Sequence, residues 1–209
     1  MHPKRTIIFD FDGTLADTLP ALLSISNRLA PQLGYRQVRD QDIEQLRGKG
    51  LREVMRWLEI SMFQFPMIAA RLKAELGQEM HRLSPIPSVK AVVQQLSKQF
   101  ALGILTSNTP ANVQRFLEAN QMQVFDFVYT TRSLYKKSRV LRRILKEQQL
   151  NPMETLYVGD EERDVAAAHR CQLEALAVTW GANTEAALRL AQPEQLIHHP
   201  EALLTIPHL

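Results

Sequence analysis

An apolar segment that leads directly into closely spaced acidic residues constrains this chain more than any other feature. Residues 7–18 read IIFDFDGTLADT, so two isoleucines and a phenylalanine precede Asp10 and Asp12. A continuous apolar run of this kind is typical of a strand buried on both faces of a parallel sheet. Open α/β sheets place ligand sites just past the carboxyl ends of such strands. We therefore expect a functional site here, rather than the surface turn that Asp and Gly commonly form.

The spacing of the two aspartates favours a joint role. Asp10 and Asp12 are two residues apart, so an extended backbone directs both carboxylates to the same side. Burying them beside an apolar strand is costly unless another group compensates their charge. Gly13 then allows the backbone to turn tightly.

The rest of the chain predicts an α/β fold with a helical insertion. Helical spacing dominates residues 18–84, and no strand signal occurs there. From residue 88 onward, apolar strands alternate with helices, which predicts a parallel sheet covered by helices on both faces. The prolines near residue 85 are expected to form the connection back to the sheet. We expect one domain from residues 1–17 and 85–209, and a helical domain from 18–84.

Ser88 is expected to cap the fifth of nine helices, and no regular element is predicted after residue 190. Helices are expected at 19–33, 40–47, 51–60, 65–83, 88–98, 110–119, 139–149, 163–170 and 184–190. Strands are expected at 7–9, 101–106, 125–130, 155–159 and 175–180.

Composition limits the class of partner. The 209 residues carry a formal net charge of +3, which favours an anionic ligand such as a phosphate ester but is too weak to indicate nucleic acid. The single cysteine, Cys171, excludes an internal disulfide and a cysteine-based zinc site and predicts a reduced, cytoplasmic protein. The chain has no run of 18 apolar residues, so no membrane span is expected. The apolar part of the N-terminus is too short for a signal peptide.

Two later segments also place polar groups after apolar strands. In LTSN, residues 105–108, the Ser107 hydroxyl and nearby backbone amides could cradle a phosphate, while Asn108 or Thr109 could cap the next helix. In VGDEERD, residues 158–164, two aspartates lie four residues apart. If a helix begins at once, both face the same side, although acids at a helix start are also favoured by its dipole.

A third segment supplies candidate cations. YKKS, residues 135–138, opens a basic helix, and lysines there are usually part of a solvated face. Crowded carboxylates and phosphate nevertheless need a cation to neutralise them. The position just before the helix favours Lys137, and Lys136 stays open.

These segments together carry a family resemblance. DFDGTLADT, residues 10–18, resembles the first motif, DxDGT[LV]xD[ST], of the haloacid dehalogenase-like phosphatases. Ser107, one of the two lysines, and Asp160 with Asp164 in GDxxxD match the later motifs in the correct order. The resemblance implies a Rossmann-like sheet with an inserted helical cap, of the phosphoglycolate phosphatase type. The cap agrees with the family only in type.

The resemblance also implies roles for the matched residues. Asp10 would attack phosphorus and form an aspartyl phosphate, and Asp12 would protonate the leaving alcohol and then activate water. Ser107 and the lysine would hold phosphoryl oxygens. The substrate-binding candidates beside them are Gly13, Thr14 and Asn108.

A magnesium ion is the implied cofactor. Asp10, Asp160 and the main-chain carbonyl of Asp12 would hold it, and Asp164 would support the metal or the lysine. Magnesium prefers oxygen ligands and bridges carboxylates to phosphate groups. The implied partner is a small phosphorylated metabolite.

The helical domain and the rival functions leave questions open. Arg47 and Lys49 flank Gly48 in a loop between two expected helices, where they could contact substrate or simply cap helices. A sugar-phosphate mutase would use the same motifs, and a non-catalytic phospho-ligand-binding or regulatory protein could keep the fold. A phospho-receiver domain is disfavoured, because receivers need neither Asp12 nor a helical insertion. The physiological substrate and the oligomeric state stay open.

Overall fold

The computed structural model, which describes residues 5–131 and 136–206, is built on one parallel sheet. Its six strands lie in the order β3-β2-β1-β4-β5-β6. β1 pairs with β2 and β4 in matching register, so that Phe9 lies beside Ile104 on one side and Val158 on the other. The strands are β1 Thr6–Phe9, β2 Ala101–Thr106, β3 Phe127–Thr130, β4 Thr155–Gly159, β5 Glu174–Val178 and β6 Gln195–Ile197.

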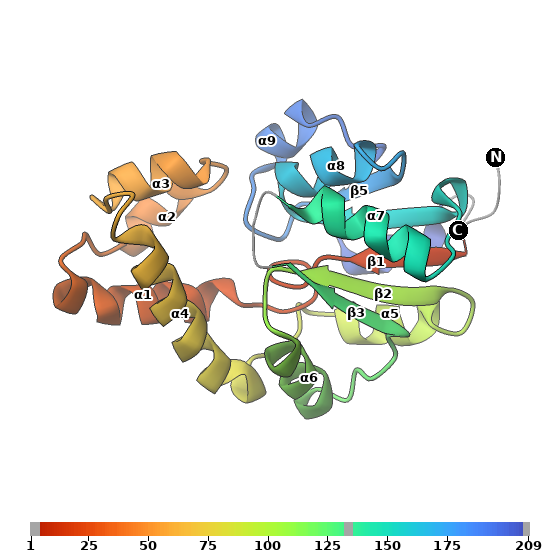
Figure 1. Cartoon of the computed structure of the whole chain (residues 1–209), viewed down its shortest axis with the longest axis horizontal. Helices are drawn as coiled ribbons and strands as arrows, with labels where there is room; N and C mark the ends of the chain where they lie inside the picture. The colour runs from red at the N-terminus through yellow and green to blue at the C-terminus, as the bar shows by residue number, and fades with distance from the viewer. Residues whose placement is uncertain (1–4, 132–135, 207–209) are drawn as a thin grey trace.

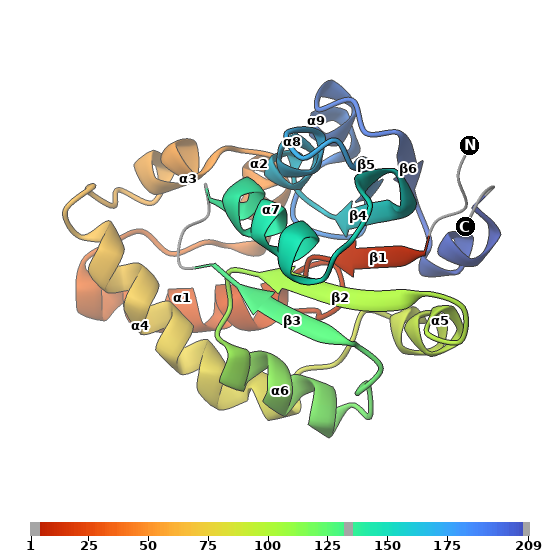
Figure 2. The ribbon, with the colours of Figure 1, turned by 45° about the vertical axis from the view of Figure 1, so that its right-hand side comes forward.

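Helices cover both faces of the sheet (Figures 1 and 2). Successive β1 side chains enter two separate cores: Ile7 and Phe9 join one apolar cluster, and Ile8 joins the other. Alternation of this kind follows from the two-residue period of a strand and explains why the whole segment is apolar. The first core includes α5 Val89–Leu96, α6 Pro110–Ala119 and the 3-10 helix η3 Pro200–Thr205. The second includes α7 Lys137–Glu147, α8 Glu162–His169 and α9 Glu185–Leu190. A further 3-10 helix, η2 Pro152–Glu154, precedes β4.

A helical insert lies beside the sheet, near the end of β1 (Figure 1). It comprises α1 Leu19–Leu33, α2 Asp40–Leu46, α3 Leu51–Trp57, α4 Phe65–Glu79 and the 3-10 helix η1 Met80–Arg82. α1 packs against α4. Residues 19–84, all of which the structure describes, form no strand. The predicted fold class, a parallel α/β sheet with an inserted helical cap, is confirmed.

The two connections of the helical insert run side by side. Ala16 bridges to Pro85 in antiparallel fashion. The amide of Asp17 donates to the carbonyl of Ser84 at 3.1 Å, and the amide of Ile86 donates to that of Leu15 at 3.0 Å. The chain thus enters and leaves the helical insert through two short segments that are hydrogen-bonded to each other. The second segment lies where the prolines near residue 85 predicted the connection back to the sheet.

Some sequence expectations were wrong in detail. The strand expected at 125–130 begins at Phe127, and the helix expected at 139–149 begins at Lys137. Ser88 precedes α5, but its side chain makes no capping hydrogen bond, and its φ of +67° is left-handed. The tail forms β6 and η3, which carry too few periodic residues to be recognised. Within the described residues, no helix has the length and apolarity needed to cross a membrane.

Candidate active site

The polar residues that follow β1, β2 and β4 meet at one edge of the sheet. The amide of Asp10 donates to the carbonyl of Val158 at 2.8 Å, which fixes the end of β1 beside the end of β4. Asp10, Asp160 and Asp164 are each at most 4% exposed. One carboxylate oxygen from each lies within 4.8 Å of the others. The tertiary structure thus gathers three buried acids from two sequence motifs.

Lys137 supplies the cation within this acidic cluster. Its Nζ lies 2.7 Å from Oδ2 of Asp10 and also donates a hydrogen bond to Oδ1 of Asp164. Burial alone would lower the pKa of Lys137, but Asp10 and Asp164 raise it well above its usual range. Lys136 is exposed. The geometry therefore favours Lys137 over Lys136, and Tyr135 of the same motif lies outside the described residues.

The acidic cluster holds more negative charge than Lys137 can balance. Burial raises the pKa of Asp10 well above its usual range, although Lys137 acts in the opposite direction. Burial, followed by the charges of Glu161 and Asp164, raises the pKa of Asp160 to about 7. Crowded, buried carboxylates of this kind fit a divalent cation with oxygen ligands. The donor set therefore fits a divalent cation such as the magnesium ion that the family resemblance implies.

Asp160 is held by neighbours on both sides. Thr14 Oγ1 donates to its Oδ1 at 2.8 Å, and the amide of Ala182 donates to its Oδ2 at 2.7 Å. A Cβ on Gly13, whose φ is +79°, would lie 2.4 Å from Oδ2 of Asp160. A Cβ on Gly181 would lie 2.2 Å from Cβ of Asp160. Thr14 and Gly13, expected as substrate-binding residues, therefore contact or closely approach a candidate metal ligand.

The segment after β5 was missed by the sequence reasoning. Trp180 Nε1 donates to the carbonyl of Thr14 at 3.2 Å, and the Asn183 side chain accepts from the amide of Glu162 at 2.8 Å. Residues 180–183 thus pack against two motifs at once. A glycine just past a predicted strand, as in Trp180-Gly181, was the available signal.

Asp12 has surroundings quite different from those of Asp10. Its carboxylate accepts from Nδ2 of Asn108 at 3.2 Å, and from Oγ1 of Thr106 at 3.4 Å. Burial raises its pKa, and the Asn108 hydrogen bond opposes that shift. The Asp12 carboxylate is not part of the three-acid cluster, but it lines the adjoining cavity. The two aspartates thus face the same edge with different partners, as a division of chemical roles requires.

The structure of the turn after β2 shows which of Asn108 and Thr109 caps the next helix. Thr109 Oγ1 accepts from the amide of Asn112 at 3.2 Å, so Thr109 caps α6. Asn108 instead reaches Asp12, while its Oδ1 accepts from Nδ2 of Asn112 at 2.8 Å. Ser107 lines the cavity next to Asp12.

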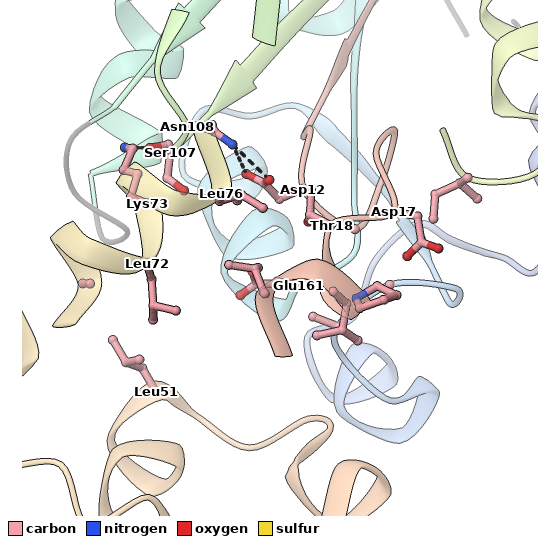
Figure 3. Close-up of a pocket in the computed structure, with 18 of the residues that line it drawn as sticks. Asp12, Asp17, Thr18, Leu51, Leu72, Lys73, Leu76, Ser107, Asn108 and Glu161 are labelled. Carbon is pink, nitrogen blue, oxygen red and sulfur yellow. Dashed lines mark hydrogen bonds between the residues drawn. The ribbon is translucent and has the colours of Figure 1, made fainter. Parts of the chain in front are cut away.

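A cavity of about 460 Å³ lies between the helical insert and the sheet edge (Figure 3). Leu51 and Leu72 line it from the helical insert, and Asp12, Ser107 and Glu161 line it from the sheet side. A compartment bounded by both parts of the molecule can enclose a small ligand beside the acidic cluster.

Arg47 and Lys49, which the sequence left open as substrate contacts or helix caps, lie outside the lining of this cavity. Arg47 Nη2 donates to the carbonyl of Gly181 at 3.0 Å, and Nη1 pairs with Glu44 at 3.6 Å. Arg47 therefore links the helical insert to the segment that supports Asp160.

Comparison with known proteins agrees with this geometry. The sequence profile of the haloacid dehalogenase-like hydrolases matches residues 7–178. The chain is 37% identical over 202 residues to the phosphoglycolate phosphatase of Synechococcus elongatus, covering 96% of this chain and 95% of that protein. It is 25% identical over 209 residues to the pyrophosphatase PpaX of Bacillus mycoides, covering 97% and 96%.

Solved structures show the same fold. A haloacid dehalogenase-like family hydrolase from Streptococcus pneumoniae superposes with a TM-score of 0.84 at 23% identity, covering 97% of each chain. A predicted phosphoglycolate phosphatase from Haemophilus somnus superposes with a TM-score of 0.80 at 20% identity, covering 98% of each. The profile match and the Synechococcus elongatus relative confirm the resemblance seen in the motifs: this chain belongs to the haloacid dehalogenase-like hydrolases.

Proposed function

We propose that this hydrolase is a magnesium-dependent phosphatase that cleaves a small phosphate monoester through an aspartyl phosphate on Asp10. The observation that carries the proposal is the contact of Lys137 with Asp10 inside a cluster of three buried carboxylates. An ammonium in this position can hold the nucleophile and a phosphoryl oxygen together. Ser107, at the cavity wall, is the proposed second phosphoryl contact.

The two aspartates divide the chemistry in this proposal. Asp10 Oδ forms a bond to phosphorus as the bond from phosphorus to the ester oxygen breaks. Asp12 gives its proton to the departing alkoxide, and its raised pKa favours the protonated form needed for that step. Asp12 then accepts a proton from the water that cleaves the aspartyl phosphate. Asn108 keeps the Asp12 carboxyl in place during both steps.

Asp10, Asp160 and Asp164 are the proposed side-chain surroundings of the magnesium ion, with the main-chain carbonyl of Asp12 as a further ligand. A bound magnesium ion would neutralise negative charge shared between the carboxylates and the phosphoryl group. Thr14 and Ala182 hold Asp160 in position for that role. We also propose that residues 18–84 act as a cap domain over a sheet domain of residues 1–17 and 85–209.

Phosphoglycolate is the first substrate to test, because the relative at 37% identity is a phosphoglycolate phosphatase. Inorganic pyrophosphate belongs in the same panel, because another relative is a pyrophosphatase. The experiment measures phosphate release from both compounds and from an aryl phosphate, with magnesium and with a chelator. Magnesium-dependent release that is abolished in Asp10→Asn supports the proposal.

The control is an Asp10→Asn protein that keeps the wild-type circular dichroism spectrum. Unchanged turnover in that variant would refute the nucleophile assignment. A folded wild-type protein that binds magnesium and hydrolyses none of the panel would instead favour a sugar-phosphate mutase or a phospho-ligand-binding protein.

A further inference from the structure

One face of α4 presents a single charge to the cavity. Ala69, Leu72, Lys73 and Leu76 all line it, and their spacing places them on one side of the helix. Three of the four are apolar, as expected for a helix face that packs over a pocket. A lysine in this stripe costs desolvation energy that an apolar residue would avoid. Its position therefore suggests a function beyond packing.

The Lys73 ammonium has unused hydrogen-bonding capacity. Nζ donates to the main-chain carbonyl of Ser107, next to the proposed phosphoryl site (Figure 3). An ammonium has three donors, so this neutral acceptor leaves two available. Lys73 forms no ion pair with any carboxylate of the described residues. Partial burial lowers the pKa of Lys73, and the charge of Asp12 opposes that shift.

The other two nearby cations each form an ion pair with a carboxylate. Arg163, which also lines the cavity, forms an ion pair with Glu161. Lys137 contacts Asp10 and Asp164. Among the described residues that line the cavity, Lys73 is therefore the basic side chain without a carboxylate partner.

We propose that Lys73 binds a second anionic group of the substrate, a carboxylate close to the phosphate, and so selects short phosphorylated acids. The inference rests on the proposed phosphatase function and names its substrate class. Since the Lys73 ammonium lies one hydrogen bond from Ser107, it reaches groups only a few bonds from the phosphorus. The other α4 residues at the cavity, being apolar, offer no alternative partner for such a carboxylate.

Two other roles for Lys73 make different predictions. If Lys73 only ties the helical insert to the Ser107 turn, its loss would affect all substrates alike. If it binds the phosphoryl group, its loss would also affect all phosphate esters alike. Only recognition of a second anion makes the loss depend on that anion.

The test compares two substrates that differ in the carboxylate. Phosphoglycolate and 2-hydroxyethyl phosphate have the same two-carbon length, but only the first carries a carboxylate. In Lys73→Met, we expect kcat/KM for phosphoglycolate to fall about 10- to 100-fold, the usual weight of a charge-assisted hydrogen bond. The value for 2-hydroxyethyl phosphate should change by less than about threefold, and Lys73→Arg should recover part of the loss. Exposed Lys98 offers a charge-matched control, Lys98→Met, which should leave both values at the wild-type level.

Equal losses for both substrates in a folded Lys73→Met protein, or no loss for either, would overturn the inference. Its failure is separable from failure of the phosphatase proposal, which would appear as wild-type turnover that is absent or insensitive to Asp10→Asn. If the wild type turns over neither compound, calorimetry with both compounds tests Lys73 directly. A preference for phosphoglycolate that disappears in Lys73→Met supports the inference, and an unchanged preference refutes it.

Discussion

The ammonium nitrogen of Lys137 lies 2.7 Å from Oδ2 of Asp10 and also contacts Asp164. Lys137 and Asp10 are both nearly inaccessible to solvent, with side chains 2% and 5% exposed. A buried ammonium is tolerated here because carboxylates surround it, and they in turn need its charge. This contact joins the first motif of the chain to the start of α7 and orients the proposed nucleophile.

Lys137→Met should lower kcat by on the order of 10²–10³-fold, because one donor to the developing phosphoryl charge is removed. Lys136→Met should stay within about twofold of wild type, as is usual for an exposed position. Steady-state kinetics of phosphate release measures both, with circular dichroism to verify folding. A larger loss in Lys136→Met than in Lys137→Met would reverse the assignment of the catalytic lysine.

Asp12→Asn should discriminate between leaving groups. An alkyl phosphate needs a proton on its departing oxygen, whereas an aryl phosphate with an acidic phenol needs much less help. We expect the variant to lose on the order of 10²–10⁴-fold in the rate of aspartyl phosphate formation from the alkyl ester, and markedly less from p-nitrophenyl phosphate. Single-turnover kinetics measures that step apart from hydrolysis of the intermediate. Similar losses for both esters would argue against Asp12 as the general acid.

The stability of the metal-free protein should fall as pH rises from about 4 to about 7. Asp160 has a pKa of about 7 in the fold, raised from 3.8, chiefly by burial. Across that window the folded protein keeps a proton that the unfolded chain has released, so the free energy of unfolding decreases with pH. Urea unfolding with a chelator present measures the slope, and Asp160→Asn should reduce it.

Magnesium affinity should depend on the same titration of Asp160. Since the metal competes with the proton on Asp160, apparent magnesium affinity should rise with pH and level off above about 7. Calorimetric titration at several pH values measures the trend. An affinity independent of pH between 5 and 7 would contradict a role for Asp160 as ligand.

Gly181→Ala should weaken magnesium binding about 10- to 100-fold, because the added Cβ would lie 2.2 Å from Cβ of Asp160 and force that ligand to move. Gly50→Ala is the matched control: the nearest heavy atom to its added Cβ, Oε2 of Glu53, is 3.9 Å away. Calorimetry gives the affinities of both variants. Wild-type affinity in Gly181→Ala would mean that magnesium binding does not depend on the position that the Asp160 carboxylate occupies in this structure.

The fold could be predicted largely because its signals are local. The apolar run at residues 7–9 and the alternating strands and helices after residue 88 each lie within a single element. β6 was missed because its three residues, Gln195–Ile197, are too few to show a period. The start of α7 at Lys137 was misplaced because the first residues of this helix are basic or polar and show no apolar periodicity.

The candidate site likewise has parts that the sequence predicted and parts that it did not. The sequence by itself predicted that acids follow two buried strands, because the apolar runs before Asp10 and Asp160 are local signals. It favoured Lys137 by position but left Lys136 open, because adjacent lysines differ only in which way the folded chain turns them. It also gave Arg47 and Lys49 as basic candidates in the helical insert, whereas Lys73 lines the cavity.

The residues of the motifs and the alternation of strands and helices could be predicted from the sequence, because strand period, turn residues and helix periodicity each depend on a few neighbouring residues. Only the tertiary structure decided that Ala182 supports Asp160, that Arg47 meets the segment after β5, and that Lys73 reaches the Ser107 turn. These contacts join segments 22 to 134 residues apart, and a lysine or arginine on a helix has the same local pattern whether it faces solvent or a cavity. Long-range packing of the helical insert against the sheet edge provides the missing information.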